Sequence, residues 1–377
     1  MLTDAWVPPH SVVSRLIPGS RGERWRERYH PELAATPVTA FTGSLMRHEV
    51  GWRLGRLHGW RLFEARNAWF QREAAAVIDR LPAGTRAIVF AHSYSALEVF
   101  RRAKARGWLL VLGQIDPGAR HFQVVADAAR HAPEYGPPPA PPPATYVANW
   151  RAECALADRI AVNSEWSRSC LEAEGVPAEK LAVVPLAYEP PSATAEAHQY
   201  PAAFSAGRPL RVLCVGQVAV AKGLQATLEA LALVEDLPLE LVIVGERTAQ
   251  VPTRFLDQPR LRWTGAVSRS GVMGFYQDAD VLLFPSLSDG FGMVQVEAQG
   301  WRLPIIASRT CGAVVRDGVN GLLLPEVTPA AIAGALRRVA ADPRLLERWS
   351  RASAVGAQGG VRALGECLVE LVTRPAS

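Results

Sequence analysis

Two carboxylates eight positions apart make the pattern with the most direct chemical meaning in this sequence. Asp289 and Glu297 enclose the run Gly290-Phe291-Gly292-Met293-Val294, which follows an apolar segment, Val281–Phe284. This order predicts a buried strand, a glycine-containing turn and a helix, with Glu297 about two turns into the helix. The first N–H groups of such a helix lack intrahelical partners and attract anions. Carboxylates beside an anion site are suited to accept hydrogen bonds from sugar hydroxyls.

A lysine supplies the positive charge that an anion site needs. The chain has three lysines, and one of them, Lys222, follows the predicted strand Leu210–Gly216 and opens a predicted helix. A lysine placed there acts as a point charge on a phosphate. Gln217, just after the same strand, can donate a hydrogen bond but brings no charge. These residue types together favour a diphosphate ligand.

These segments resemble the retaining glycosyltransferases of the GT4 type, which have the GT-B fold. Asp289 stands where the family's E-x7-E motif has its first glutamate, and Glu297 matches the second. The resemblance extends over residues 86–345 and is specific as a combination. The further matching segments are Lys222-Gly223, Leu241–Gly245, Trp263-Thr264-Gly265, Ala279-Asp280, Leu303–Ser308, Gly318–Gly321, Ala157–Ser164 and Gly175–Leu181.

The expected fold class is α/β. Strands and helices alternate from about Ala87 onward, which predicts parallel sheets covered by helices. The resemblance implies a GT-B architecture, with two Rossmann-like domains facing across a cleft. We predict an acceptor-side domain over 1–195, a nucleotide-sugar-binding domain over 205–355, and a helix over 356–377 that crosses back to the first domain. Prolines between Glu189 and Pro209 mark the boundary. The run Pro137–Pro143 is predicted to be a stiff extended loop within the first domain, not a domain linker.

The first domain departs from the family at its start. Residues Leu2–Pro9 resemble the family's second strand and the loop after it, so the usual first βα unit is expected to be missing. A late start codon and a reduced first sheet both remain open as explanations. The missing loop normally lines the acceptor side in this family.

The resemblance assigns roles in donor binding to residues of the second domain. Lys222 and backbone groups near the helix start would hold the diphosphate, Glu297 the ribose, and Asp289 the donor sugar. Gly265, Ala266 and Val267 would meet the base, whose identity the sequence does not choose. The donor-binding residues are Gly216, Gln217, Lys222, Gly265, Val267, Gly290, Phe291, Gly292, Met293, Val294 and Glu297.

The first domain contributes its own candidates. His92 ends the strand Ile88–Ala91 and occupies the position of the family's cleft histidine. Asp116 ends the next strand at the cleft side, and His121 is expected nearby. A lone histidine is also compatible with a purely structural role. The predicted catalytic residues are His92, Asp116, Lys222 and Asp289.

The resemblance implies transfer of a sugar from a nucleotide-sugar donor to an unidentified acceptor, with retention, no metal and no cofactor. The donor's own phosphate would help to deprotonate the acceptor, while Lys222 and helix amides stabilise the departing diphosphate. Two alternatives stay open. One is a catalytically inactive GT-B partner or nucleotide-sugar-binding subunit, suggested by Gln217 and the missing βα unit. The other is a sugar-nucleotide epimerase or phosphorylase of the same fold.

Composition limits the setting. The 377 residues are enough for two domains, and 49% hydrophobic with 20% charged residues is ordinary for a globular protein. No apolar run is long enough to span a membrane, and no signal-peptide pattern is present. Five scattered cysteines suit a reducing compartment. The expected location is the bacterial cytoplasm.

Positive charge is concentrated at the N-terminal side. Residues 1–150 carry 19 Lys or Arg against 12 Asp or Glu, a net of +7, whereas the remainder carries 22 against 24, a net of −2. One interpretation is a solvated arginine face. Another is a surface for an anionic or lipid-linked acceptor, with peripheral contact at the inner membrane face. No nucleic-acid motif is present, so nucleic acid is not an expected partner.

The segment Leu45–Phe70 would make that membrane contact. Helical spacing predicts that Leu54, Leu57 and Leu62 pack inward, leaving the tryptophans and arginines exposed. The alternative is that the tryptophans are core residues. They are Trp52, Trp60 and Trp69.

Overall fold

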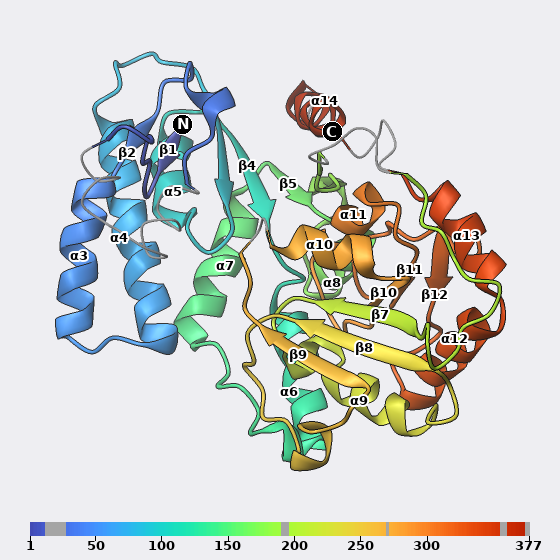
Figure 1. Cartoon of the computed structure of the whole chain (residues 1–377). Helices are drawn as coiled ribbons and strands as arrows, with labels where there is room; N and C mark the ends of the chain where they lie inside the picture. The colour runs from blue at the N-terminus through green and yellow to red at the C-terminus, as the bar shows by residue number, and fades with distance from the viewer. Residues whose placement is uncertain (12–27, 190–195, 269–270, 355–359, 374–377) are drawn as a thin grey trace. The chain divides into compact units, whose positions relative to one another are not determined.

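The chain forms two compact units (Figure 1). The computed structural model describes residues 1–11, 28–189, 196–268, 271–354 and 360–373. One unit comprises residues 1–112 and 142–157, and the other 113–141 and 158–377. The predicted limits 1–195, 205–355 and 356–377 remain predictions, because part of the interval between them lies outside the described residues. No helix in the described parts of the chain is long and apolar enough to cross a membrane.

A six-stranded sheet organises the larger unit, in the order β12-β11-β10-β7-β8-β9, and its recorded strand pairs are all parallel. Strand order reverses between β7 and β10, where Leu213 lies opposite Leu282. In sheets of this kind, ligands bind beyond the carboxyl ends of the strands at the reversal. The strands are β7 (Leu210–Val215), β8 (Leu239–Val244), β9 (Leu261–Gly265), β10 (Val281–Phe284), β11 (Ile305–Ala307) and β12 (Gly321–Leu323).

Helices cover both faces of this sheet (Figure 1). Side chains alternate between the faces, so Val212 and Leu283 pack in one apolar cluster while Leu213 and Leu282 pack in the other. This confirms the predicted α/β class with parallel sheets. The first cluster includes α9 (Leu224–Ala232), α12 (Pro329–Ala341) and α13 (Pro343–Ala352), and the second includes α10 (Val272–Asp278) and α11 (Met293–Gly300).

Helix α6 (Ala119–His131) is anchored to the core of the larger unit. The short 3₁₀ helix η2 (Pro133–Tyr135) follows it, and Tyr135 is buried in the apolar cluster that contains β7 and β8. The backbone N–H of Gln250 donates to the Tyr135 carbonyl at 3.0 Å, and Arg254 forms two hydrogen bonds of 2.7 Å with Glu134. Residues 119–135 are therefore held beside the six-stranded sheet.

A four-stranded sheet has the order β3-β4-β5-β6, which follows the chain. Within the larger unit, β5 and β6 pair in parallel, with Ile160 opposite Leu181. The bounds are β3 (Ile88–His92), β4 (Leu109–Gln114), β5 (Arg159–Val162) and β6 (Leu181–Val183); this unit also contains α8 (Glu165–Ala173), α14 (Val361–Thr373), η3 (Ala178–Lys180), η4 (Val220–Lys222) and η5 (Thr253–Phe255).

The smaller unit begins with a two-stranded parallel pair, in which Leu2 lies opposite Thr39. Residues 12–27, between these strands, lie outside the described residues, so the expected absence of the first βα unit remains a prediction. The elements of this unit besides β3 and most of β4 are β1 (Leu2–Thr3), η1 (Pro31–Leu33), β2 (Thr39–Ala40), α3 (Thr42–Leu54), α4 (Gly59–Asp79), α5 (Leu97–Ala105) and α7 (Ala144–Leu156).

The prediction for the tryptophan-bearing segment was wrong at three positions. Trp52 and Trp69 are buried, at 9% and 3% exposure, whereas Leu54 is 81% exposed. The two indole rings meet edge to face, with centroids 6.0 Å apart. The cause is local, because α3 ends at Leu54 and the chain reverses before α4. Helical spacing counted across that reversal does not describe one face. Trp60 is half-buried, with its ring centroid 4.9 Å from that of Tyr146.

Glu153 of α7 fixes the loop that follows β3. Its buried carboxylate accepts hydrogen bonds from the backbone N–H groups of Tyr94 at 2.6 Å, Ala96 at 2.8 Å and Leu97 at 3.1 Å. Helix α5 has no side-chain cap of its own, so Glu153 satisfies its first amides from outside. Burial raises the pKa of Glu153 to about 7, although the three N–H groups oppose that rise.

This carboxylate makes folding stability depend on pH. The pKa of Glu153 is about 7 in the folded state and 4.5 ordinarily. The contribution of this carboxyl group to the free energy of unfolding is therefore fully present below pH 4.5 and is lost as the pH rises through 7. Between about pH 5 and about pH 8 we expect Glu153 to reduce the free energy of unfolding by about 2–3 kcal/mol. Urea denaturation should show a flatter pH dependence for Glu153→Gln. Glu179→Gln serves as the control, because Glu179 is exposed. If the two variants show the same pH dependence of stability, Glu153 does not have the raised pKa that we assign to it.

Candidate functional site

The candidate site lies in the larger unit, beyond the carboxyl ends of β7 and β10. The 3₁₀ helix η4 carries Lys222 and is followed by Gly223, whose φ is +72°. A Cβ atom at position 223 would lie 2.1 Å from the carbonyl oxygen of Pro285, so only glycine allows this approach. The N–H of Leu287 also donates to the Ala221 carbonyl at 2.8 Å. The lysine is thereby held against the loop after β10.

Lys222 and Asp289 form an ion pair between these two loops. The side chains are 36% and 17% exposed, and the Lys222 Nζ atom lies 5.6 Å from the centroid of the Phe284 ring. Residues 285–292, between β10 and α11, form the acidic loop. The backbone N–H of Asp289 donates to the Thr310 carbonyl at 2.9 Å, which anchors this loop on its other side. The pair is half-buried, so each charge is compensated by the other.

Helix α11 directs its first amides into the same region. Gly292 precedes the helix with a φ of +80°, and no side chain caps the N-terminus. A Cβ atom at 292 would lie 2.6 Å from the Phe284 ring. The glycine is therefore required by both backbone conformation and space. An uncapped N-terminus close to Lys222 provides two independent attractions for an anion.

Glu297 lies in the first turns of α11 and is oriented by Tyr276 of α10. The buried Tyr276 hydroxyl donates to Oε2 of Glu297 at 2.7 Å. Burial raises the pKa of Tyr276, and the neighbouring Glu297 raises it further, so the phenol remains a donor. The sequence did not identify Tyr276, because one aromatic residue before a buried strand is indistinguishable from a core residue.

His121 reaches the acidic loop from α6. Its Nδ1 atom lies 3.2 Å from Oγ of Ser288, and Nε1 of Trp166 donates to the same oxygen at 3.2 Å. The indole can only donate, whereas the Ser288 hydroxyl is able both to donate to His121 Nδ1 and to accept from it. Burial lowers the pKa of His121, while Asp116 and Asp289 oppose that shift.

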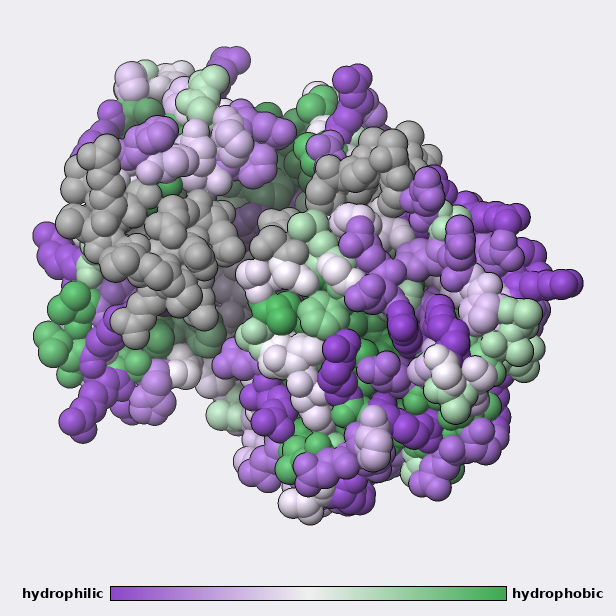
Figure 2. Space-filling view, viewed as in Figure 1, coloured by the Kyte–Doolittle hydropathy of each residue, from purple (hydrophilic) through white to green (hydrophobic). Residues whose placement is uncertain are grey.

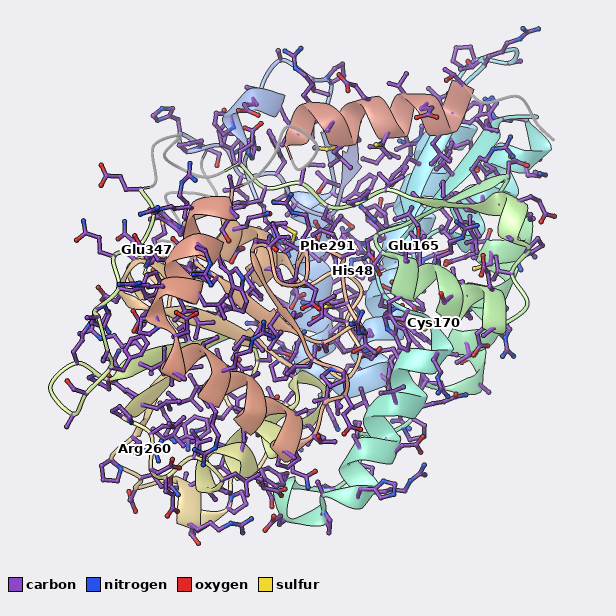
Figure 3. The ribbon with its side chains drawn as sticks, turned by 90° about the vertical axis from the view of Figure 1, so that its right-hand side faces the viewer. His48, Glu165, Cys170, Arg260, Phe291 and Glu347 are labelled. Atoms are coloured by element: carbon purple, nitrogen blue, oxygen red, sulfur yellow. The ribbon has the colours of Figure 1, made fainter. Side chains whose placement is uncertain are left out.

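The segment after β5 clamps the acidic loop. Ser164 Oγ donates to the Gly290 carbonyl at 2.5 Å and also caps α8 by accepting from the Ser167 N–H at 3.1 Å. A Cβ atom at 290 would lie 2.6 Å from the Ile115 carbonyl oxygen and 2.7 Å from Asn163 Nδ2. Figure 3 labels Glu165 at the start of α8 and Phe291 on the clamped loop. The sequence included Asn163 and Ser164 only as part of a family-like run.

The remaining predicted donor residues lie at strand ends. Gly216, with a φ of +127°, and the exposed Gln217 follow β7 and line a cavity of about 40 Å³ together with Lys222. No atom lies within 4 Å of the Cβ position at Gly216, so this backbone is accessible. Gly265 ends β9, and Val267 beyond it is 39% exposed.

The two first-domain candidates have different positions. Asp116 Oδ1 accepts from the Gly118 N–H at 2.9 Å and from Gln114 Nε2 at 3.0 Å, which shapes the turn before α6. It belongs to the larger unit with Lys222 and Asp289. His92 belongs to the smaller unit. It is exposed at the end of β3 and lines a pocket of about 920 Å³.

The described residues contain no group of three His, Cys, Asp or Glu side chains placed to hold a metal ion. Metal independence nevertheless stays a prediction. One Asp-x-Asp sequence, Asp278-Ala279-Asp280, is present. Arg208 binds the nearly buried Asp280 through two hydrogen bonds of 2.7 Å, so this carboxylate is occupied by a structural ion pair.

Comparison with known families agrees with this geometry. Residues 209–342, which include Lys222, Asp289 and Glu297, match the family described as Glycosyl transferases group 1. The matched residues make up about a third of the chain, and over that part the chain is similar to the group 1 glycosyltransferases. The matched residues contain all six strands from β7 to β12.

Relatives include D-inositol 3-phosphate glycosyltransferases. The protein of that name from Streptomyces bingchenggensis is 35% identical over 111 residues, which is 29% of this chain and 24% of the relative. The one from Mycolicibacterium vanbaalenii is 44% identical over 84 residues, or 22% of this chain and 19% of the relative. The matched part thus spans about a quarter of these relatives' length or less.

Solved structures share the fold over more of the chain. Sucrose-phosphate synthase from Thermosynechococcus elongatus superposes with a TM-score of 0.64 at 21% identity, covering 83% of this chain and 78% of the other. HepE from Anabaena, in complex with UDP, has a TM-score of 0.61 at 16% identity, covering 99% and 98%. The fold is the GT-B fold of glycosyltransferases, as predicted.

The clamp on the acidic loop predicts a steep steric cost at position 290. Gly290→Ala would force the Ile115 carbonyl and Asn163 apart, so we expect a loss of about 1–3 kcal/mol in the free energy of unfolding. Gly274→Ala in α10 is the matched control, because nothing lies within 4 Å of its Cβ position. Thermal and urea denaturation of both variants test this. Equal stability of the two would show that the loop is not clamped.

Proposed function

We propose that this protein is a retaining glycosyltransferase that moves a sugar from a nucleotide-sugar donor to an acceptor hydroxyl, without a metal or other cofactor. The observation that carries the proposal is the Lys222–Asp289 pair at the strand-order reversal, beside the uncapped start of α11. A cation, free helix amides and carboxylates at one place match the parts of a nucleotide sugar. The match of residues 209–342 to the group 1 glycosyltransferase family supports the same conclusion.

Diphosphate binding would rearrange the ion pair. Lys222 would exchange Asp289 for phosphate oxygens, while amides of Met293 and Val294 bind the same anion. The released Asp289 would then accept a hydrogen bond from a hydroxyl of the donor sugar. Glu297, held by Tyr276, would accept from the ribose hydroxyls, and Gly265 and Val267 would border the base.

The reaction exchanges one bond to the anomeric carbon for another on the same face of the sugar. The bond to the diphosphate oxygen breaks, and the nucleoside diphosphate leaves with that electron pair. The acceptor oxygen bonds to the anomeric carbon, and its proton passes to a phosphate oxygen of the leaving group. Lys222 and the α11 amides stabilise the negative charge that develops on the diphosphate. His92 and Asp116 remain our candidates for acceptor-side and sugar-side contacts.

A UDP-sugar is the first donor to test. HepE has been solved with UDP and with UDP-glucose, and starch synthase IV from Arabidopsis with ADP. Thermal-shift assays with UDP-, GDP-, ADP- and TDP-sugars would identify the base, since a ligand at 100 times its Kd stabilises by roughly 2.7 kcal/mol. Donor binding without transfer to any acceptor would instead support an inactive subunit.

Lys222→Ala should weaken donor binding strongly. Loss of a charge-assisted hydrogen bond costs about 1.5–3 kcal/mol, which weakens affinity about 10- to 150-fold. Lys180→Ala is the control, because it removes the same charge away from the site. Calorimetric titration with the best donor measures both variants. Wild-type affinity in Lys222→Ala would refute the assignment.

Asp289→Asn should separate nucleotide binding from transfer. The substitution removes the carboxylate that competes for Lys222, so the affinity for the nucleoside diphosphate alone should stay equal or increase. Sugar transfer should fall by at least tenfold, because an amide is a weaker acceptor for the sugar hydroxyl. Titration with the nucleoside diphosphate and initial rates with the nucleotide sugar give the two readings. Weaker diphosphate binding with an unchanged rate would contradict these roles.

We further propose that the acceptor is lipid-linked or anionic, and that the protein works in the cytoplasm at the inner membrane face. The net charge of +7 over residues 1–150 supports this part of the proposal. So does the large pocket of the smaller unit, in which apolar side chains such as Phe63 and Phe70 lie beside Arg53 and Arg66.

A further inference from the structure

The turn between α3 and α4 exposes apolar side chains that no described residue covers. We define the hairpin tip as Val50, Leu54, Arg56, Arg61 and Phe63. Leu54 is 81% exposed, Val50 59% and Phe63 57%, the three largest exposures among the apolar residues of α3 and α4. Figure 2 shows a hydrophobic patch with protruding hydrophilic side chains over this end of the two helices. The most exposed leucine of the described chain thus lies at a helix end, not in a core.

Arginines surround this patch. Residues 45–70 contain five Arg and two Glu, a net charge of +3. Both acidic side chains are engaged, because Glu49 pairs with Arg53 and Arg66, and Glu64 accepts a hydrogen bond from Thr145 at 2.8 Å. The remaining arginines, Arg47, Arg56 and Arg61, are exposed and form no ion pair with the described residues. The tip therefore carries uncompensated positive charge around an apolar centre.

We propose that the hairpin tip docks on an anionic lipid bilayer, with Leu54 entering the interface and Arg56 and Arg61 meeting lipid phosphates. An apolar side chain at the end of a two-helix hairpin, ringed by long cationic side chains, suits a surface that is apolar below and negatively charged above. Positive charge alone would fit any polyanion, but the exposed Leu54 gains only from an apolar phase. The buried Trp52 and Trp69 support the hairpin from inside and are not the anchor.

The hairpin tip is continuous with the large pocket of the smaller unit. Val50 and Phe63 belong to both, and the pocket continues past Arg53 and Arg66 to His92. An acceptor carried by a lipid could enter this pocket from the bilayer surface. This purpose rests on the proposed function, whereas the docking itself can be measured without any turnover.

Vesicle co-sedimentation of the full chain tests the inference. We expect binding to phosphatidylcholine vesicles that contain phosphatidylglycerol, no binding to phosphatidylcholine alone, and release at high salt. Arg56→Ala combined with Arg61→Ala should weaken partitioning roughly 30-fold, since each basic residue near the surface contributes on the order of 1 kcal/mol. Leu54→Glu should abolish binding while the far-UV spectrum and the melting temperature stay as in the wild type.

Matched controls come from the larger unit. Arg338→Ala combined with Arg344→Ala removes two exposed charges, and Leu233→Glu changes a leucine that is 49% exposed. Both should bind vesicles like the wild type. Absence of wild-type binding at low salt overturns the inference, as does loss of binding in the controls equal to that in the tip variants. Donor affinity measured on the same preparations separates this outcome from failure of the proposed transferase, because the tip variants should bind the nucleotide sugar normally.

Discussion

The parallel pairing of β7 with β10 is the constraint on which the candidate site depends. It places two loops from distant parts of the sequence next to each other at one edge of the sheet, one with Lys222 and one with Asp289. Three further contacts of the site secure that adjacency. Gly223 allows the backbones to approach, Thr310 holds the acidic loop on its far side, and Ser164 fixes its carbonyl. Without the reversal of strand order, the same residues would be scattered over the surface.

Much of the donor side could be predicted from the sequence, because its signals are local. An apolar run followed by a glycine turn and a helix specifies a strand, a loop and an anion-attracting helix start, and the structure contains β10 and α11 there. Lys222 could be singled out because lysines are rare in this chain. The supporting groups could not be found in this way. Tyr276, Ser288 and Trp166 act through contacts across more than twenty residues, and their types are common in any core.

In the hairpin of α3 and α4, the sequence pattern predicted the wrong residues to be buried. Helical periodicity is reliable only within one helix, and α3 ends at Leu54 with Gly55 as its C-cap, a stop signal that the periodicity count passed over. Helical spacing that is counted across the turn exchanges the buried and exposed faces. It therefore predicts the tryptophans at the surface and Leu54 in the core. The role of Glu153 could not be predicted from the sequence either, because it depends on three backbone N–H groups more than fifty residues away.

Under the proposed function, the Lys222–Asp289 pair would also select among ligands. A simple anion such as inorganic phosphate could draw Lys222 away, but it would leave the 17%-exposed carboxylate of Asp289 without a counter-charge. Only a ligand that brings an anion and a suitably placed hydroxyl donor compensates both partners at once. The ion pair would therefore discriminate against simple phosphate anions and in favour of a nucleotide sugar, which brings both a charge for Lys222 and a hydroxyl for Asp289.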